Sequence, residues 1–454
     1  MNPDIFREYD IRGKAEIDLT DADVFRLGQA YGTYVQDKGV TRCVVGRDVR
    51  LSGPRIQKAL TEGILATGLD VIDLGVVPTP VFYFSFFHLD AAAGMMITAS
   101  HNPPDENGFK VGLGKTTIYG PEIQNLRLLA EAGRFRQGKG RLTKADVIPA
   151  YIQMCRSKVD IPARLKVAFD PGNGTAGVVL ERLFAGTQVQ PTFINLKPDG
   201  TFPAHVPDPT VPKYMRQLIE LVKAGGFDCG FGYDGDGDRI GTIDDQGETV
   251  YGDKLLAIFA RDIISRIPKA KIVFEVKCSQ GLIEYINAIG GTPIMWKTGH
   301  SLIKAKMKAE GAPIAGEMSG HMFFADDYYG YDDAIFASLR LLRILARTGR
   351  KLSELVAELP YYHSTPEIRV DCPDRVKFRI VAELRDHFRR EFTVIDIDGA
   401  RVVFPDGWGL VRASNTQPIL VLRFEARTKE RLAQIRQLFY EQLRRYPEVR
   451  LPQD

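Results

Sequence analysis

A strand–turn–helix–strand–helix–strand pattern occurs three times along this chain of 454 residues and constrains its possible folds more than any other feature. Each copy begins with a short apolar run followed by an acidic residue and a glycine-containing turn; the runs span residues 42–46, 166–170 and 271–275. Helices that cross over between strands predict mostly parallel sheets with both faces covered. The pattern therefore predicts an α/β protein built from a repeated unit.

The chain is too long for one hydrophobic core, so we expect several domains. We place three α/β domains with mixed, mostly parallel sheets at residues 1–146, 147–248 and 249–361. From about Tyr362 onward, strand-like runs alternate with helical segments. This change predicts a smaller C-terminal α+β domain with an antiparallel sheet over residues 362–454.

The composition excludes several classes of protein. Hydrophobic residues make up 44% of the chain and charged residues 26%, and the net charge is only +3, so we expect no nucleic-acid partner. The five cysteines are scattered without a CxxC pair, which argues against a disulfide framework and against a zinc site. The N-terminal segment contains neither a signal core nor a bilayer-spanning run, so we expect a cytoplasmic protein without a membrane partner.

The first copy of the pattern ends in a polar loop at residues 98–103, with the sequence TASHNP, which we call the serine loop. It follows the apolar run of residues 91–97, which is typical of a buried strand. Ser100 is therefore held rigidly and can still be reached from outside, so it is a candidate nucleophile if a base or a cation lies nearby. The alternative is an ordinary turn with a few capping hydrogen bonds.

The second copy ends in the acidic loop, residues 234–239, with the sequence DGDGDR. Its three carboxylates, Asp234, Asp236 and Asp238, would repel one another strongly unless a divalent cation lay among them. A calcium EF-hand does not fit, because the sixth position of the loop is Arg239 and the twelfth is Asp245. We therefore predict a magnesium site, with a solvated acidic turn as the alternative.

Together, the two loops favour phosphoryl chemistry. A serine beside Mg²⁺, with Arg239 close by, could carry a phosphoryl group whose charge the metal and the guanidinium neutralise. His101 and Lys110 are candidates for general acid and base work near Ser100. The alternatives are a hydrogen-bonded loop histidine and a surface lysine.

Two later loops supply groups that could bind a sugar phosphate. The C-terminal loop, residues 412–418, offers a guanidinium, hydroxyls, an amide and successive backbone donors, which together suit a phosphate dianion. In the glutamate loop, residues 316–321, Glu317 and Ser319 are suited to neighbouring sugar hydroxyls. Residues 297–301 end a strand and enter a helix, so they either line the same cleft or form a capped helix start. Because ligands gather beyond the carboxyl ends of strands, we expect the loops to converge on one cleft.

With these loops, the chain resembles the α-D-phosphohexomutases, and most of all their bacterial phosphomannomutase/phosphoglucomutase branch. The resemblance covers essentially the whole length. It is carried by four motifs in family order and by a fifth near the N-terminus, namely TASHNP, DGDGDR, GEMSGH (residues 316–321), RASNTQP (residues 412–418) and FREYDIRG (residues 6–13).

The resemblance implies a role for each site residue. Ser100 would be the phosphoserine, and the three aspartates of the acidic loop would hold Mg²⁺ together with a Ser100 phosphoryl oxygen. Glu317 and Ser319 would contact O3 and O4 of the sugar, with Lys277 and His300 assisting. The substrate phosphate would be held by Arg412, Ser414, Asn415 and Thr416. The catalytic end would be lined by Tyr9, Arg12, Lys110 and Arg239.

The implied reaction moves a phosphoryl group between the 1- and 6-positions of a hexose phosphate through a hexose 1,6-bisphosphate, which also acts as activator. Mannose and glucose share O3 and O4, so both should be accepted. A phosphoglucosamine mutase remains an alternative, although that branch usually carries another residue where Met318 stands. A metal-dependent sugar-phosphate phosphatase is a further alternative, but it would not need the C-terminal loop. We expect a monomer whose partners are small hexose phosphates.

Overall fold

The computed structural model describes residues 1–415 and 417–452. Within these residues, contacts divide the chain into two compact units. Unit 1 comprises Met1–Leu255 and Ser319–Val356, and unit 2 comprises Leu256–Met318 and Ala357–Asp454. The chain crosses between the units three times: within helix α8 (Gly252–Ile264), between Met318 and Ser319 in the glutamate loop, and at the end of helix α12 (Leu352–Ala357).

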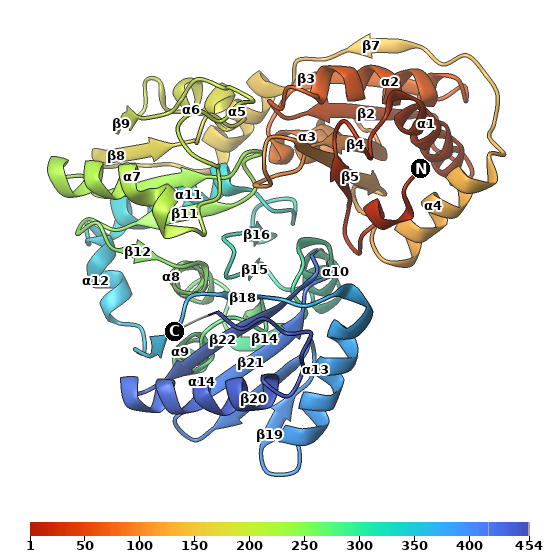
Figure 1. Cartoon of the computed structure of the whole chain (residues 1–454). Helices are drawn as coiled ribbons and strands as arrows, with labels where there is room; N and C mark the ends of the chain where they lie inside the picture. Colours follow the sequence, from red (N-terminus) through yellow and green to blue (C-terminus); the bar gives the residue numbers. More distant parts are fainter. Residues whose placement is uncertain (416, 453–454) are drawn as a thin grey trace. The chain divides into compact units, whose positions relative to one another are not determined.

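The N-terminal part of unit 1 is a mixed sheet with helices on both faces (Figure 1). Its strand order is β1-β5-β4-β2-β3-β7, with β6 beside β5. The strands are β1 (Ile11–Lys14), β2 (Arg42–Arg47), β3 (Asp70–Val76), β4 (Ala93–Ile97), β5 (Glu106–Leu113), β6 (Thr116–Thr117) and β7 (Leu142–Lys144). The helices are η1 (Pro3–Ile5), α1 (Asp21–Gln36), α2 (Gly53–Leu65), α3 (Thr79–His88) and α4 (Pro121–Ala132).

Helix α1 forms as its sequence predicts. Thr20 caps its N-terminus by accepting a hydrogen bond from the Asp23 N–H, which satisfies one of the free donors of the first turn. Val24, Leu27, Tyr31 and Val35 recur at the spacing that predicts one apolar face of a helix, and in the structure they are buried against the sheet in a core that α2 and α4 share. The opposite face of the sheet packs on α3, where Phe86 lies so close to Gly94 and Gly112 that a Cβ there would clash with its ring.

The second sheet of unit 1 has the order β12-β11-β10-β8-β9. Strand β8 pairs in parallel with β9 and β10, while β11 returns antiparallel to β10. The strands are β8 (Leu165–Asp170), β9 (Val189–Phe193), β10 (Cys229–Tyr233), β11 (Ile240–Ile243) and β12 (Thr249–Val250). The helices are α5 (Ile148–Lys158), α6 (Gly177–Phe184) and α7 (Pro212–Gly225). Unit 1 also contains β16 (Met322–Phe324) and α11 (Ala334–Thr348).

Unit 2 contains the third copy of the repeated pattern. Strand β13 lies between β14 and β15, and both pairings are parallel. These strands are β13 (Lys271–Glu275), β14 (Thr292–Trp296) and β15 (Ile314–Gly316). They alternate along the chain with the helices α9 (Gln280–Ala288) and α10 (His300–Glu310), as the repeat predicts.

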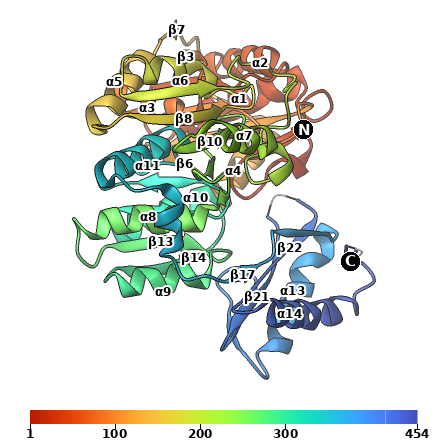
Figure 2. The ribbon, with the colours of Figure 1, turned by 90° about the vertical axis from the view of Figure 1, so that its left-hand side faces the viewer.

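The C-terminal part of unit 2 is an antiparallel sheet of order β17-β22-β21-β20-β19, with β18 also paired to β22. Figure 2 shows α13 and α14 lying along one face of this sheet. Ile380 of α13 and Phe439 of α14 are fully buried in the core that they form with the strands. The elements are β17 (His363–Ser364), β18 (Ile368–Asp371), β19 (Thr393–Ile395), β20 (Ala400–Phe404), β21 (Gly407–Ala413), β22 (Ile419–Ala426), α13 (Asp374–Phe388) and α14 (Lys429–Leu443).

The predicted fold class is confirmed: three α/β domains are followed by a C-terminal α+β domain. The serine, acidic and glutamate loops follow β4, β10 and β15, each the last strand of its repeat. Two local predictions were wrong. Asn107 and Gly108, which are typical turn residues and are therefore predicted in the polar loop that follows Ser100, belong to β5; Arg412 lies on β21 and not in the turn after it. Among residues 1–415 and 417–452, no helix is both long and apolar enough to cross a bilayer.

Candidate active site

Ser100 lies directly against the acidic loop of the next domain, within unit 1. Its side chain is almost fully buried, and its Oγ donates a hydrogen bond to Asp234 Oδ2 at 2.6 Å. His101 Nδ1 lies 3.2 Å from the same Oγ. The backbone of Ser100 has a φ of 51°, which is uncommon for a residue other than glycine and is often found at functional sites. The fold thus joins the two loops that the sequence singled out.

The acidic loop folds tightly around its first aspartate. Asp234 Oδ1 accepts the backbone N–H groups of Asp238 and Arg239, each at 3.1 Å. Gly235 permits the contact with the serine loop, because a Cβ at this position would lie 2.5 Å from the Ser100 carbonyl oxygen. Asp234, Asp236 and Asp238 are all fully buried, and each has a carboxylate oxygen within 4.8 Å of the others.

Lys110, on β5, places its ammonium group among these carboxylates. Its Nζ lies 2.6 Å from Asp236 Oδ2 and also donates to Asp238 Oδ2. Burial by itself would lower the pKa of Lys110, but the surrounding aspartates raise it above its usual value. Lys110 is therefore a buried cation that neutralises part of the acidic cluster.

The carboxylates of the acidic loop differ in their environments. Burial, together with repulsion from neighbouring carboxylates, raises the pKa of Asp234 and of Asp238. Burial opposes ionisation of Asp236 too, yet the contact with Lys110 holds its pKa below the usual range. Asp236 Oδ1 and Asp238 Oδ1 are buried without a hydrogen-bond partner among the residues that the structure describes. Converging oxygen atoms left unsatisfied in this way fit a hard divalent cation, so the cluster is an acidic metal-binding site.

Arg12 contacts the serine loop, and Arg239 lies beside the acidic loop. Arg12 is held by Asp10 Oδ2 at 2.6 Å and donates to Asn102 Oδ1 in the serine loop at 3.1 Å. Arg239 Nε lies 3.9 Å from Asp234 Oδ2. Tyr9 is the remaining residue predicted at the catalytic end. Its side chain is buried, and it lies near Arg12 in the sequence.

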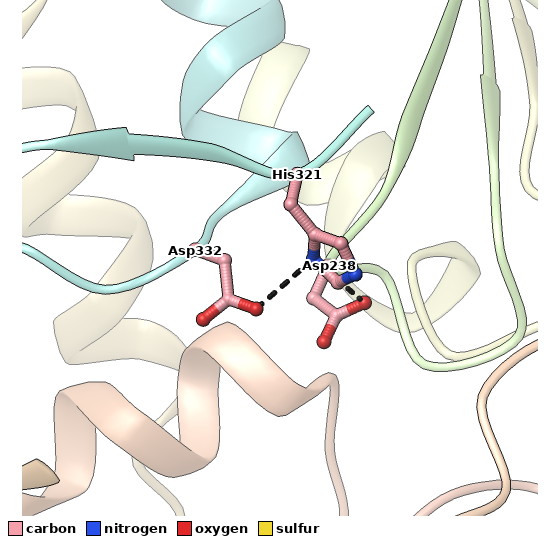
Figure 3. A group of neighbouring side chains, drawn as sticks. All are labelled: Asp238, His321 and Asp332. Atoms are coloured by element: carbon pink, nitrogen blue, oxygen red, sulfur yellow. Dashed lines mark ion pairs between the residues drawn. The ribbon is translucent and has the colours of Figure 1, made fainter. Parts of the chain in front are cut away.

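His321 and Asp332 also belong to this site, although the sequence analysis did not assign them (Figure 3). Arg239 Nε donates to His321 Nε2 at 2.9 Å, and the other ring nitrogen, Nδ1, lies 3.0 Å from Asp332 Oδ2 and 3.7 Å from Asp238 Oδ1. An imidazole that accepts at Nε2 carries its proton at Nδ1, facing the two carboxylates. The available signal for His321 was its place at the end of GEMSGH, whereas no sequence signal marked Asp332.

In unit 2, the predicted sugar-binding residues meet around Glu275. Its carboxylate accepts the backbone N–H of Lys277 at 2.7 Å and the hydroxyl of Thr298 at 3.0 Å. Glu317 Oε1 accepts the N–H of Gly299 at 2.6 Å, directly before His300 at the start of α10. Glu317, Lys277 and His300 are therefore brought together, and each is mostly buried.

Asp398 connects this group to Arg412. It accepts the Arg412 Nε at 3.0 Å and the backbone N–H of Thr298, also at 3.0 Å. The Lys277 ammonium lies 2.9 Å from Glu367 Oε2, and burial, which would lower the pKa of Lys277, is outweighed by the carboxylates of Glu367 and Glu275. Unit 2 thus places two cations, Lys277 and Arg412, among the predicted substrate residues, and each of them is paired with a carboxylate.

A buried lysine, Lys377, binds the backbone of the C-terminal loop. Lys377 Nζ donates to the carbonyl oxygens of Ser414 and, at 2.9 Å, Gln417. Ser414 is mostly buried and Asn415 is partly buried beside it. Thr416, which we also predicted as a phosphate ligand, lies outside the described residues.

The predicted site residues therefore fall into two groups. Unit 1 brings together the serine loop, the acidic loop, Arg12, Lys110 and Arg239, and it also contains Ser319, two residues before His321. Unit 2 brings together Lys277, His300, Glu317 and Arg412 with Ser414 and Asn415. Convergence of the two groups on one cleft stays a prediction.

Sequence comparison relates each part of this architecture to one family. The descriptions "Phosphoglucomutase/phosphomannomutase, alpha/beta/alpha domain I", "domain II" and "domain III" match residues 3–134, 149–247 and 251–362. The description "Phosphoglucomutase/phosphomannomutase, C-terminal domain" matches residues 367–442.

Comparison with whole proteins gives the same relationship. A curated phosphomannomutase/phosphoglucomutase of Pseudomonas aeruginosa is 45% identical over 97% of this chain and 95% of the relative. A phosphoglucomutase of Neisseria meningitidis is 42% identical over 96% of each chain. The crystal structure of a phosphoglucomutase/phosphomannomutase family protein from Burkholderia thailandensis superimposes with a TM-score of 0.92 at 40% identity, covering 100% of both chains. Because these matches extend over nearly the whole sequence, the chain belongs to the phosphoglucomutase/phosphomannomutase family.

Proposed function

We propose that the protein interconverts the 1- and 6-phosphates of mannose and of glucose through a phosphorylated Ser100 and a hexose 1,6-bisphosphate. The observation that carries this proposal is the 2.6 Å hydrogen bond from Ser100 Oγ to Asp234 Oδ2, which places a nucleophilic hydroxyl against a metal-binding cluster. The names of the relatives from Pseudomonas and Neisseria support both the reaction and the two sugars.

The acidic loop suits Mg²⁺. Asp234, Asp236 and Asp238 would hold the ion together with an oxygen of the phosphoryl group on Ser100. When bound, Mg²⁺ would supply positive charge that stabilises the phosphoryl group as it is transferred. An oxygen-only ligand set favours Mg²⁺ over softer transition metals.

The other residues around Ser100 orient it and balance charge. Asp234 fixes the direction of the Ser100 hydroxyl, and Lys110 and Arg239 supply positive charge next to the acidic loop. Because the Lys110 ammonium contacts both Asp236 and Asp238, we assign Lys110 an electrostatic role rather than that of a base. His101, Arg12 and Tyr9 complete the catalytic end, with His101 as the candidate for proton transfer at 3.2 Å from Ser100 Oγ.

The residues of unit 2 would hold the substrate. Arg412, Ser414, Asn415 and Thr416 would bind the phosphate that is not being transferred, and Glu317 and Ser319 would bind O3 and O4, with help from Lys277 and His300. A site that reads O3 and O4 accepts both mannose and glucose, because these sugars differ at C2. A phosphatase would not need a second phosphate site, so the presence of the C-terminal loop, residues 412–418, favours a mutase.

The remaining features of the proposal follow the sequence. We assign domain boundaries near residues 146, 248 and 361, a cytoplasmic monomer, hexose phosphates as the partners and hexose 1,6-bisphosphate as the activator. Neither nucleic acid nor a membrane is part of the proposed function.

The test is the variant Ser100→Ala, assayed with mannose 1-phosphate and glucose 1-phosphate in the presence of Mg²⁺ and glucose 1,6-bisphosphate. We expect kcat to fall at least ~1,000-fold, while substrate affinity changes less than ~3-fold, because only the acceptor of the phosphoryl group is removed. Ser338→Ala is the matched control, since Ser338 is also fully buried but its Oγ donates within α11 to the Ile335 carbonyl. Turnover by Ser100→Ala near the wild-type rate would reject the proposal.

A further inference from the structure

We propose that Arg50 is a positioning residue that holds the serine loop in the conformation required for phosphoryl transfer. The inference rests on the proposed role of Ser100 and extends it to a residue outside the family motifs considered above. Arg50 lies between β2 and α2, far from Ser100 in the sequence, and its side chain is completely buried.

The guanidinium of Arg50 binds the serine loop and the residues that follow it through their backbone carbonyls. Its Nη2 donates to the carbonyl oxygens of Ser100 at 3.0 Å and Asn102 at 2.6 Å. Its Nη1 donates to those of Pro103 at 2.5 Å and Glu106 at 2.9 Å. Together with the Nε–H, which donates to a carboxylate, these bonds engage all five N–H donors that a guanidinium possesses. A lysine, with three donors at a single point, could not replace this fork.

Asp48 connects Arg50 to the other side of Ser100. Asp48 Oδ2 accepts the Arg50 Nε at 3.1 Å and the Thr98 hydroxyl at 2.8 Å. The oxygen of that hydroxyl accepts the backbone N–H of Ser100 at 2.9 Å. One buried ion pair therefore holds both the N–H and the C=O of Ser100, directly or through Thr98.

This arrangement explains how Ser100 keeps its unusual backbone. A φ of 51° is unfavourable for a side chain with a Cβ, and such conformations persist where the surroundings over-determine them. The bonds from Arg50 and Thr98 fix the peptide groups on both sides of Ser100, and so they set the direction in which its Oγ points. That direction decides whether Oγ meets Asp234.

Arg50 itself does not act on the phosphoryl group. Its donors point to the backbone, and its guanidinium is covered by the Phe202 ring at 5.4 Å. Its effect on the reaction is therefore transmitted through the placement of Ser100. Misplacing a reacting atom by about 1 Å can cost ~100-fold in rate, which sets the size of the expected effect.

The experiment compares wild type, Arg50→Lys and Thr98→Val for the rate at which glucose 1,6-bisphosphate phosphorylates Ser100, followed by intact mass and peptide mapping, and for kcat and KM. Arg340→Lys is the matched control, because Arg340 is also buried and its guanidinium pairs with Asp326 at 2.8 Å through both nitrogens, away from the serine loop. Amide hydrogen exchange is measured over residues 98–106 and over the acidic loop.

We expect Arg50→Lys to lower both the phosphorylation rate and kcat about 100-fold and Thr98→Val to lower them about tenfold, with KM changed less than ~3-fold. Amide exchange should accelerate in residues 98–106 but not in the acidic loop, and Arg340→Lys should retain wild-type rates.

If Arg50→Lys does not fold, Thr98→Val alone tests the inference, since this variant keeps the ion pair between Asp48 and Arg50. The inference would be overturned if Arg50→Lys or Thr98→Val were phosphorylated at the wild-type rate. It would also be overturned if either variant lost no more activity than Arg340→Lys. Absence of phosphorylation in wild type would instead reject the proposed function and, with it, this inference.

Discussion

Lys110 neutralises only part of the acidic loop and leaves carboxylate oxygens that a metal ion could bind. Its ammonium group bridges Asp236 and Asp238, yet each of these carboxylates retains an Oδ1 without a hydrogen-bond partner among residues 1–415 and 417–452. The three carboxyl groups of the acidic loop thus outnumber the two cations, Lys110 and Arg239, that contact them. A divalent cation would satisfy both the free oxygens and the charge.

Replacing Asp238 should therefore weaken metal binding more than folding. For Asp238→Asn we expect Mg²⁺ affinity, measured by isothermal titration calorimetry, to fall at least ~10-fold because a charged ligand is lost. The melting temperature of the metal-free protein should not fall, since repulsion among the carboxylates decreases. Asp208→Asn is the control: Asp208 is also buried, but it accepts hydrogen bonds from Thr210 outside the cluster. Unchanged Mg²⁺ affinity in Asp238→Asn would contradict the assigned metal site.

Sequence motifs identified residues whose partners lie close to them in the sequence. They missed residues whose partners become neighbours only in the folded chain. The acidic loop carries its three carboxylates within a few residues, so its metal affinity could be read directly from their spacing. Asp332 and Asp398 look like ordinary acidic residues, because their partners His321 and Arg412 become neighbours only in the folded chain. Arg50 is a similar case, since a guanidinium that binds carbonyl oxygens leaves no pattern in the side chains of the loop that it holds.

At the scale of elements, helix α11 begins at a buried carboxyl group with an unusual environment. Asp333 is its N-cap and accepts hydrogen bonds from the Phe336 N–H at 2.7 Å and from the Tyr151 and Tyr328 hydroxyls. Burial raises the pKa of Asp333 to about 7, although these donors oppose the shift. The start of α11 is therefore sensitive to pH.

The raised pKa of Asp333 has a defined consequence for stability. Between pH 3.8, the ordinary aspartate value, and about pH 7, the unfolded chain ionises while the folded one stays protonated, so stability falls as pH rises and levels off above about 7. The ceiling of this contribution is about 4 kcal/mol. We expect the melting temperature of Asp333→Asn to fall less than that of wild type as pH rises through this range. Asp160→Asn, at an exposed position, should show the same pH dependence as wild type. Parallel curves for wild type and Asp333→Asn across this range would be inconsistent with the buried, protonated carboxyl.

The sequence pattern does not indicate β5 or β21 as strands, because glycine interrupts their apolar runs. Strand β21 begins Gly-Trp-Gly, and β5 contains Gly108 and Gly112, whereas glycine is generally depleted in strands. In the fold these glycines have a packing role: a Cβ on Gly409 would clash with the Phe439 ring, and one on Gly112 with Phe86. Elements with a strong apolar period and a cap, such as α1, were predicted correctly.

At the scale of the whole molecule, the proposed reaction requires residues of both units to act on the same substrate. Unit 1 contains the residues proposed for phosphoryl transfer, and unit 2 contains Arg412 and Lys277, which are proposed to hold the substrate. The repeated pattern was sufficient to predict the order of the α/β domains and the C-terminal domain. It could not supply the relation between loops of different repeats, which depends on packing between domains.

Arg412→Ala tests this division of roles. Arg412 is mostly buried and pairs with Asp398 at 3.0 Å, so its loss removes a guanidinium preset for a phosphate. We expect KM for glucose 1-phosphate to rise about 100-fold, with Mg²⁺ affinity unchanged. Arg379→Ala, at an exposed arginine paired with Glu383, should change neither quantity. A loss of Mg²⁺ affinity in Arg412→Ala with KM unaltered would refute the assignment.

Transfer from Ser100 can be observed directly by following one phosphoryl group through a single turnover. Protein labelled at Ser100 with radioactive phosphate is mixed with a single equivalent of unlabelled glucose 1-phosphate in the presence of Mg²⁺, quenched rapidly, and its products are separated. If Ser100 carries the transferred group, the label leaves the protein and appears first in glucose 1,6-bisphosphate and then in glucose 6-phosphate. Label that stays on the protein while product forms, or that leaves as inorganic phosphate, would contradict the account.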